Sequence, residues 1–519
     1  MNLLKSSAVV SGMTLISRML GFVRDMLLAS LLGTGMVADA YVVAFRFPNL
    51  FRRLFGEGAF NAAFVPLFAR RLEGAGADAA RAFAGDVLSV LLVALLIFTA
   101  AAELTMPLLM YIIAPGFQED PQKFDLAVLL TRIAFPYLGF MSLVALLSGV
   151  LNSTGRFAVA AAAPIILNIV LIAVLGTAAL SDDTGRRVTG IALTWGVSLA
   201  GLLQFAMLWW AARKAGFAVH FKKPEINDDV RRFVALGIPG VIAGGITQIN
   251  ILVGTIIASL KASAVSYLYY ADRVYQLPLG VIGIAIGVVL LPDLSRRLRA
   301  ADLSGADSSQ NRALEFSLFL TLPAAVALMV MPDAIIQVLF ERGAFVAADT
   351  RATSQALAVF AVGLPSFVMI KIFSPGFFAR EDTRTPMIFA GLSVAINIAV
   401  SIALFPSLAH VGIAVGTTVS GWANAAALGL TLYRRGHYAP DERLLRHLPR
   451  IVLSAALMGL VLWAMVTVLT GAFSAGTGLA ARIAALALLV GAGAVVYFVI
   501  AHLAGAFRLA EMKSVLRRE

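Results

Sequence analysis

The chain has 519 residues, of which 60% are hydrophobic and only 13% are charged, and its mean hydropathy is +0.89. Soluble domains carry about one quarter charged residues, so this composition excludes an ordinary soluble globular protein and indicates a chain solvated largely by lipid. The absence of cysteine excludes disulfides and thiolate chemistry, and the net charge of +12 is typical of cytoplasmic loops near anionic lipid, so we expect phospholipids rather than nucleic acid as partners.

Apolar stretches long enough to cross a bilayer recur along the whole chain. A hydrocarbon core of about 30 Å needs about 20 helical residues, and on this measure the sequence predicts about 14 membrane-spanning helices. In chain order the expected spans are 7–32, 38–68, 80–113, 126–152, 157–180, 188–212, 231–260, 265–295, 312–340, 351–378, 385–407, 411–433, 449–470 and 480–507. The predicted fold class is therefore an all-α polytopic membrane protein.

The loops between these spans predict the orientation of the chain. Arg18 and Arg24 interrupt the first apolar segment and no small-residue cleavage site follows it, so this segment is expected to stay as the first span. If the N-terminus is cytoplasmic, the cytoplasmic segments hold several times as many basic residues as the opposite ones. The positive-inside rule therefore predicts a multi-pass protein with both termini in the cytoplasm.

Matches between the two halves of the chain indicate an internal repeat. Pro136 and Asn168 align with Pro365 and Asn397 at one offset, and further matches occur in the same order nearby. The offset covers an even number of spans, so both copies cross the membrane in the same direction. We expect two pseudo-symmetric lobes of about six helices each, 1–220 and 221–440, and an unmatched pair of helices in 441–519.

Charged residues lie within a few of the spans, where they are costly unless they face a polar cavity or a partner. Asp39, Arg46 and Arg53 are seven residues apart, which puts them on one helical stripe, and Glu57 is spaced to pair with Arg53. Further charges occur in the first span and in span 265–295. The candidate substrate-binding residues are Arg18, Arg24, Asp25, Asp39, Arg46, Arg52, Arg53, Glu57, Asp272 and Arg273.

Arginine outnumbers the acidic residues in this set. The guanidinium binds phosphate oxygens through two parallel hydrogen bonds and stays charged when it is desolvated, so the set favours an anionic, phosphorylated substrate. An alternative for Arg52 and Arg53 is that they lie at a helix end and extend to lipid phosphates. For Lys371 a local structural partner and a transport role are equally open.

No pattern in the sequence indicates an enzyme, a metal site or a cofactor. The five histidines lie in loops or at span ends without metal-ligand spacing, and no phosphate-cradling G-x-x-x-x-G-K-[ST] loop occurs. We therefore expect no catalytic residues, no metal and no cofactor.

Three stretches of the sequence resemble a known family. Ser17 to Asp25 reads SRMLGFVRD, 39–60 contains DAYVVAFRFPNLFRR and EGAF, and Tyr269 to Arg273 reads YYADR. These segments closely resemble the MurJ/MviN lipid II flippases of the multidrug/oligosaccharidyl-lipid/polysaccharide exporter superfamily, and the resemblance covers essentially the whole chain.

The resemblance implies two six-helix lobes and two further helices that form a groove for a polyprenyl tail. It implies that the substrate is lipid II, an undecaprenyl diphosphate carrying the disaccharide-pentapeptide of peptidoglycan, which moves from the cytoplasmic to the periplasmic leaflet by alternating access. It also implies that Arg18, Arg24, Arg52 and Arg273 are cavity arginines, with Asp25 and Asp39 as polar partners. Relatives often have lysine at the position of Arg46.

The resemblance further implies a location in the bacterial cytoplasmic membrane, with the cell-wall synthesis machinery as a possible partner. Some relatives have a glutamate at the position of Gln276 and a sodium site that uses a carboxylate in the seventh span, but 233–260 contains no carboxylate, so that site is not expected here. Two alternatives stay open: an exporter of drugs or lipid-linked polysaccharide in the same superfamily, and a non-transporting scaffold of cell-wall synthesis.

Overall fold

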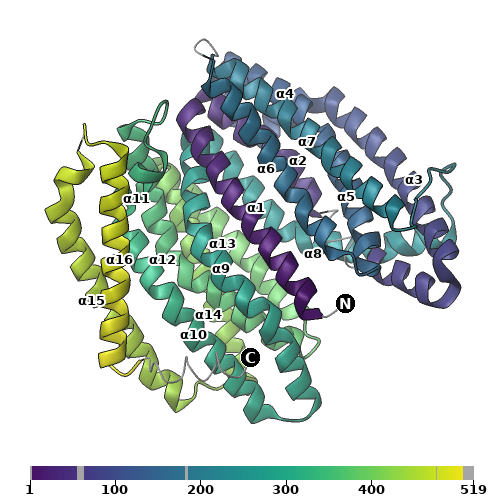
Figure 1. Ribbon diagram of the computed structural model, residues 1–519. Helices are drawn as coiled ribbons and strands as arrows, with labels where there is room; N and C mark the ends of the chain where they lie inside the picture. The colour runs from purple at the N-terminus through teal and green to yellow at the C-terminus, as the bar shows by residue number, and fades with distance from the viewer. Residues whose placement is uncertain (1–2, 55–62, 182–184, 475, 507–519) are drawn as a thin grey trace. The chain divides into compact units, whose positions relative to one another are not determined.

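The structure is a computed structural model that describes residues 3–54, 63–181, 185–474 and 476–506. Every regular element in these ranges is a helix, which confirms the all-α class (Figure 1). Two compact units are present and are described separately below. Unit 1 comprises Met1–Ser266 with Arg342–Phe345, and unit 2 comprises Tyr267–Glu341 with Val346–Glu519.

Unit 1 contains the first half of the helices. These are α1 (Leu3–Leu32), α2 (Met36–Arg52), α3 (Val65–Ile113), the short 3-10 helix η2 (Pro115–Glu119), α4 (Pro121–Ala134), α5 (Pro136–Ser153), α6 (Phe157–Ala179), α7 (Arg186–Lys214) and α8 (Asp228–Ser259). Gly76 breaks α3 with a backbone φ of 83° that side chains rarely adopt, so α3 consists of two successive helices. The expected span 38–68 corresponds to α2 and the start of α3, and 55–62 lie outside the described residues.

Unit 2 contains the remaining helices, and α9 begins at the boundary between the units. They are α9 (Ala264–Arg299), α10 (Leu303–Val330), α11 (Pro332–Phe340), α12 (Ala347–Phe378), α13 (Arg384–Leu408), α14 (His410–Arg434), α15 (Glu442–Val468), the 3-10 helix η3 (Leu469–Phe473) and α16 (Leu479–Leu503). Its core packs Ile372 and Phe377 of α12 against Leu432 of α14, among other buried aliphatic and aromatic side chains.

Ten stretches within the described residues are long and apolar enough to cross a membrane. They include α4 and α5 together as one 33-residue span and α15 together with η3. The other expected spans correspond in position to α1, α2, α8 and α9.

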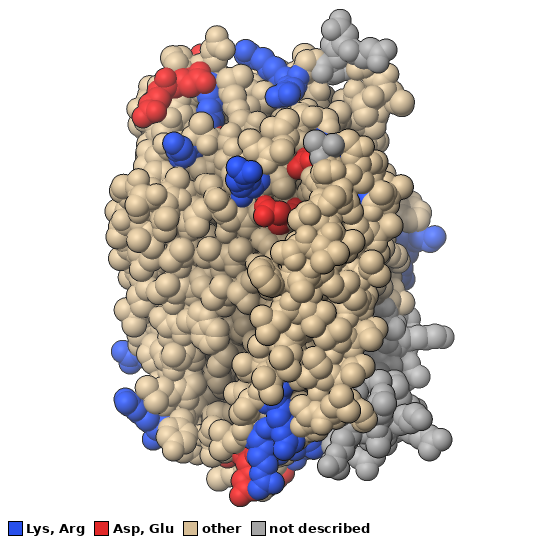
Figure 2. Space-filling view, turned by 90° about the vertical axis from the view of Figure 1, so that its left-hand side faces the viewer, with Lys and Arg blue, Asp and Glu red and all other residues tan. Residues whose placement is uncertain are grey.

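Large apolar side chains cover the surface of these helices. Trp463 of α15 and Val495 of α16 are 62% and 64% exposed, as expected for side chains that face lipid rather than water. Figure 2 shows the face on which α15 and α16 lie as a broad uncharged band, with most of the charged side chains near its two ends. This distribution matches a protein surface that crosses a hydrocarbon layer.

Prolines interrupt several spans, and side chains from neighbouring helices satisfy backbone groups at these breaks. The α4 helix ends just before Pro136, and Ser198 Oγ of α7 donates to the Ile133 carbonyl at 2.5 Å. In α10, Pro323 has no N–H to donate to the Phe319 carbonyl, and Tyr497 Oη of α16 donates to it instead at 2.6 Å. Because lipid offers no hydrogen bonds, these contacts keep the kinked helices stable in the membrane.

Candidate functional site

The charged residues of α1 form a buried cluster in unit 1. The Arg24 guanidinium donates to Asp25 Oδ1 through Nη2 at 2.7 Å and through Nε at 3.0 Å, and its Nη1 donates to Asn168 Oδ1 of α6 at 3.0 Å. Asn168 in turn donates to the Ser17 carbonyl at 2.8 Å. Arg24 is only 8% exposed and Asp25 only 2%. The cluster therefore holds one arginine in a defined orientation between α1 and α6.

Asp39 occupies a different environment from the one its helical stripe suggested. Its carboxylate is completely buried and accepts hydrogen bonds from Lys123 Nζ of α4 at 2.7 Å, from Ser263 N at 3.0 Å, and from Ser266 N and Oγ at 3.0 and 2.5 Å. Ser266 lies in the first turn of α9, so Asp39 caps the positive end of that helix. Asp39 is thus fully engaged in joining α2, α4 and the start of α9.

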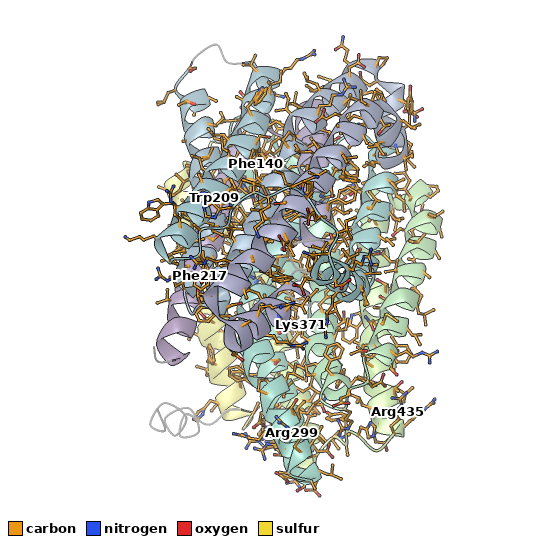
Figure 3. The ribbon with its side chains drawn as sticks, turned by 90° about the vertical axis from the view of Figure 1, so that its right-hand side faces the viewer. Phe140, Trp209, Phe217, Arg299, Lys371 and Arg435 are labelled. Atoms are coloured by element: carbon orange, nitrogen blue, oxygen red, sulfur yellow. The ribbon has the colours of Figure 1, made fainter. Side chains whose placement is uncertain are left out.

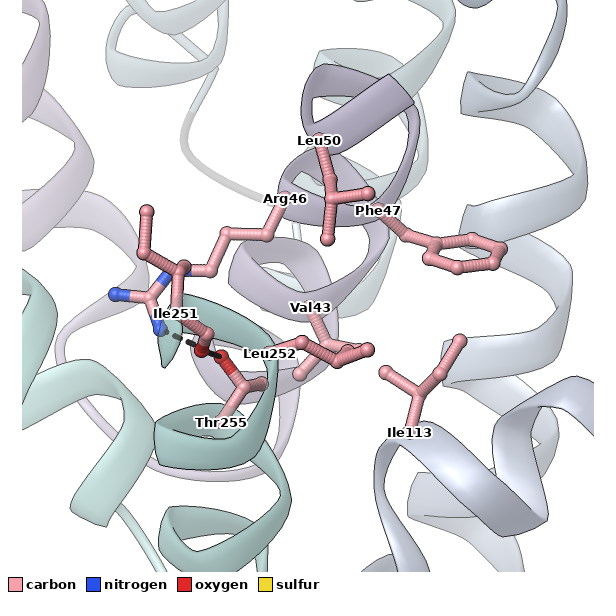
Figure 4. A pocket seen from close by; sticks show the side chains of 8 residues that line it. All are labelled: Val43, Arg46, Phe47, Leu50, Ile113, Ile251, Leu252 and Thr255. Atoms are coloured by element: carbon pink, nitrogen blue, oxygen red, sulfur yellow. Dashed lines mark hydrogen bonds between the residues drawn. The ribbon is translucent and has the colours of Figure 1, made fainter. Parts of the chain in front are cut away.

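Arg46 lies on the wall of a small apolar pocket in unit 1 (Figure 4). Its Nη1 donates to Thr255 Oγ1 of α8 at 3.1 Å, and the side chain is half-buried. The pocket is lined by Val43, Arg46, Phe47, Leu50, Ile113, Ile251, Leu252 and Thr255. Among the residues that line it, Arg46 is the charged one.

The remaining arginines of α2 lie at its C-terminal end. Arg52 Nε donates to Asn49 Oδ1 at 2.6 Å, and Arg53 is exposed. The two arginines therefore carry positive charge at the C-terminal end of α2.

Arg18 and Glu57 are the two other predicted residues of the first two expected spans. Arg18 is exposed, and within the described residues no hydrogen bond or ion pair engages it. Its guanidinium therefore has its full set of donors available to a ligand. Glu57 lies outside the described residues, so its expected pairing with Arg53 stays a prediction.

The predicted residues of α9 lie in unit 2. Asp272 accepts a hydrogen bond from Gln276, and the Arg273 guanidinium stacks over the Tyr269 ring at 4.8 Å from its centroid. Lys371 of α12 is exposed, and Figure 3 shows it away from the end of unit 2 where Arg299 and Arg435 lie. Lys371 is therefore a cation at membrane depth rather than part of a basic rim.

Sequence reasoning missed several residues that complete these clusters. Lys123 precedes the expected span 126–152, but it lies in α4 and is buried against Asp39, with its Nζ 4.1 Å from the centroid of the Phe117 ring. Asn168 was noticed only as a member of the repeat. The hydrogen bond from Arg132 Nε of α4 to the backbone carbonyl of Glu103 in α3 was also missed. No local signal in the sequence identifies these partners, because each comes from a helix distant along the chain.

The chemistry available from these residues is ionic binding rather than bond making. The guanidinium groups of Arg18, Arg24 and Arg52 offer geometrically defined donors to phosphate oxygens. Asp25 and Asn168 orient one of these groups, and Asp39 is already saturated with donors. Unit 1 is therefore suited to hold an anion.

Comparison with known proteins agrees with this arrangement. The family model described as "Lipid II flippase MurJ" matches residues 28–483. The chain is 50% identical over 519 residues to a probable lipid II flippase MurJ of Rhizobium meliloti (strain 1021), covering 100% of this chain and 97% of that protein. It is 36% identical over 470 residues to the lipid II flippase MurJ of Burkholderia cenocepacia, covering 89% of this chain and 90% of that protein.

Solved structures show the same fold. A structure titled "Lipid II flippase MurJ, inward closed conformation" has a TM-score of 0.78 at 25% identity and covers 96% of this chain and 98% of its own. An inward-facing MATE family transporter of the MOP superfamily has a TM-score of 0.66 at 13% identity, with 82% and 97% coverage, and shares the fold alone. These are transporters, not enzymes. The chain belongs to the lipid II flippase MurJ family.

Proposed function

We propose that this chain moves lipid II from the cytoplasmic to the periplasmic leaflet of the bacterial cytoplasmic membrane by alternating access. The observation that carries the proposal is full-length similarity to the MurJ family combined with arginines inside the membrane-spanning part of unit 1. The substrate's diphosphate is the chemical group that such arginines recognise. Binding it at membrane depth offsets the cost of moving the charged headgroup through the hydrocarbon.

The proposed diphosphate contacts in unit 1 are Arg18, Arg24 and Arg52, with Arg46 and Arg53 as further candidates. Arg24 is preorganised by Asp25 and Asn168, so it loses little conformational freedom when an anion binds. Asp39 is proposed as a positioning residue, because its carboxylate is buried and committed to Lys123 and α9. In unit 2, Arg273 with its neighbour Asp272 is proposed as a substrate-binding residue. Glu57 keeps its proposed role as an acidic partner.

Complementation tests the proposed function directly. We expect this chain to restore growth and cell shape to a bacterium whose own lipid II flippase has been depleted. In proteoliposomes, fluorescently labelled lipid II should become accessible on the opposite leaflet at a rate that depends on the protein. A properly inserted protein that restores neither growth nor translocation would rule out the flippase assignment in favour of a scaffold.

The proposed orientation puts both termini in the cytoplasm, with Ser474, between α15 and α16, outside and Ser304, at the start of α10, inside. Because the chain has no cysteine, single-cysteine variants report topology without background labelling. A membrane-impermeant thiol reagent added to intact cells should label Ser474→Cys but not Ser304→Cys. The reverse pattern would invert the orientation.

The proposed organisation keeps two lobes, 1–220 and 221–440, with 441–519 as a groove for the polyprenyl tail. Exposed apolar side chains on α15 and α16, including Trp463 and Val495, support this role for the last segment. Phospholipids and the cell-wall synthesis machinery are the further proposed partners.

A further inference from the structure

A groove on the surface of unit 1 lies apart from the arginine clusters of α1 and α2. It runs between the α4–α5 break and α7, and it is lined by Arg132, Ile133, Pro136, Phe140, Trp195, Ser198, Leu199 and Leu202. Trp195 is 61% exposed, and Leu199 and Leu202 are nearly half exposed. Phe140, which forms part of its wall, is labelled in Figure 3. Because these helices cross the membrane, the apolar groove faces lipid chains.

The groove lies where α4 meets α5. The α4 helix ends at Ala134 and α5 begins at Pro136, and Phe135 between them has helical backbone dihedrals, with φ −63° and ψ −36°. The hydrogen bond from Ser198 to the Ile133 carbonyl keeps α7 against the break. A polar contact between α4 and α7 therefore lies in the wall of the groove.

Two opposite charges lie beside the groove. Arg132 of α4 is exposed, and its Nε donates to the backbone carbonyl of Glu103 in α3 at 3.1 Å. The charges of Glu103 and Arg132 attract each other, yet within the described residues no hydrogen bond or ion pair engages the Glu103 carboxylate. A carboxylate in an apolar span without a close partner is unusual and indicates a ligand that the protein alone does not supply.

Arg132 lies closer to the N-terminal end of the α4–α5 span than to its C-terminal end. It is eleven residues from the start of α4, roughly 16 Å along the helix axis, and the whole span has 33 residues and is roughly 50 Å long. Glu103 is ten residues from the end of α3, roughly 15 Å. Arginine and glutamate side chains can extend several ångströms further toward the headgroups.

We propose that this groove binds a zwitterionic aminophospholipid of the leaflet at the α4 N-terminal end. One acyl chain lies in the apolar groove against Trp195 and Phe140. The lipid phosphate accepts hydrogen bonds from the Nη groups of Arg132, and the ammonium of a phosphatidylethanolamine headgroup pairs with the Glu103 carboxylate. Charge complementarity selects this headgroup, because a purely anionic lipid would leave Glu103 facing a negative charge.

Native mass spectrometry of the full-length protein tests the proposal. The protein is equilibrated with equal amounts of phosphatidylethanolamine, phosphatidylglycerol and phosphatidylcholine that have identical acyl chains. We expect preferential retention of phosphatidylethanolamine. Arg132→Gln should lower retention of phosphatidylethanolamine and phosphatidylglycerol about tenfold, the scale of a lost charge-assisted contact to phosphate. Glu103→Gln should instead shift the preference from phosphatidylethanolamine to phosphatidylglycerol.

Arg187→Gln is the matched control, because Arg187 is an exposed arginine in the first turn of α7 outside the groove. It should leave lipid retention unchanged. Thermal unfolding of each variant separates loss of the lipid from loss of the fold, and the isosteric Glu103→Gln change reports selectivity even where Arg132→Gln unfolds. Equal retention of the three lipids by the unaltered protein, or an unchanged preference in Glu103→Gln, would overturn the proposal.

Discussion

The two units use charged residues in different places. In unit 1 the Arg24–Asp25 pair is buried within α1, and the Asp39–Lys123 pair is buried in the first turns of α2 and α4. In unit 2 the ionic networks lie beside the first turns of α15 and α16. Glu315 of α10 accepts from Arg312, Arg443 and His447, while Glu341 accepts from Arg482 at 3.2 Å.

This difference separates charges that hold helices together from charges that are suited to bind substrate. The networks of unit 2 join α15 and α16 to α10 and α11, and Tyr497 adds a third attachment at the Pro323 kink. The arginine surplus of α1 and α2, by contrast, is larger than such packing requires. We therefore expect substitutions of the α1 and α2 arginines to impair transport. Substitutions in the unit 2 networks and in the Asp39–Lys123 pair should impair mainly stability.

The largest effect is expected from Arg24→Ala, because it removes a preorganised donor to the diphosphate. Transport should fall about tenfold or more, the scale of lost charge-assisted hydrogen bonds. Complementation of a flippase-depleted strain measures this loss. Since Arg24→Ala also leaves the Asp25 carboxylate buried without its cation, the double variant Arg24→Gln with Asp25→Asn is the control. This double variant should restore the amount of folded protein without restoring transport. Recovery of both would show that Arg24 is not needed to bind the diphosphate.

Asp39→Asn should lower the free energy of unfolding by about 3 kcal/mol, because it leaves Lys123 charged and buried without its counter-ion. Thermal or denaturant unfolding in detergent measures the change. Adding Lys123→Met should regain a large part of the loss. A double variant no more stable than Asp39→Asn would show that the pair itself is not what stabilises this end of unit 1.

Glu315→Gln should lower the free energy of unfolding by about 1–2 kcal/mol, since Glu315 is buried but its partners Arg312 and Arg443 are partly exposed. Transport by the folded protein should be unchanged. The measurement compares unfolding with lipid II translocation in the same proteoliposomes. If Glu315→Gln lost translocation while its stability stayed unchanged, the charged network of unit 2 would have a role in transport, contrary to this account.

The smallest effect concerns Asp382, in the loop between α12 and α13. Hydrogen bonds from Thr385 and then from Arg435 lower the pKa of this carboxyl to about 2. Its contribution to stability is therefore fully present above an ordinary aspartate pKa of about 4 and is lost as the pH falls toward 2. Because the pair is partly exposed, the contribution should stay below about 1 kcal/mol. The free energy of unfolding of Asp382→Asn, measured against pH, should lack this loss at low pH. A pH profile identical to that of the unaltered protein would contradict the prediction.

Much of the fold could be read from the sequence, because hydropathy reports long apolar helices directly. The bounds of α6, α7, α12, α13, α14 and α16 lie within about four residues of the expected spans, whereas 126–152 covers most of α4 and α5 and 312–340 covers most of α10 and α11. The partners of the charged residues could not be read in the same way. The Asp39 stripe suggested a cavity with Arg46, but tertiary packing brings Lys123 and the start of α9 to its carboxylate.

In the candidate site, too, contacts between residues close in sequence could be predicted, whereas contacts between distant helices could not. The Arg24–Asp25 pair is visible in the sequence because its members are adjacent, whereas Asn168 meets Arg24 only because α6 packs against α1. Glu103 was not predicted as a functional residue, because it is a single charge in a long apolar segment. Arg132 of α4 meets the backbone carbonyl of Glu103 only because α3 packs against α4. Pairing between distant helices is set by packing geometry, which hydropathy does not encode.

Competition binding tests most directly whether the arginines of unit 1 recognise the diphosphate. Labelled lipid II is bound to the full-length protein in nanodiscs and is displaced by undecaprenyl diphosphate or by undecaprenol. We predict that the diphosphate competes much more strongly than the alcohol, and that this difference falls about tenfold in the folded Arg24→Gln with Asp25→Asn variant. Equal competition by the two lipids, or an unchanged difference in the variant, would contradict the account.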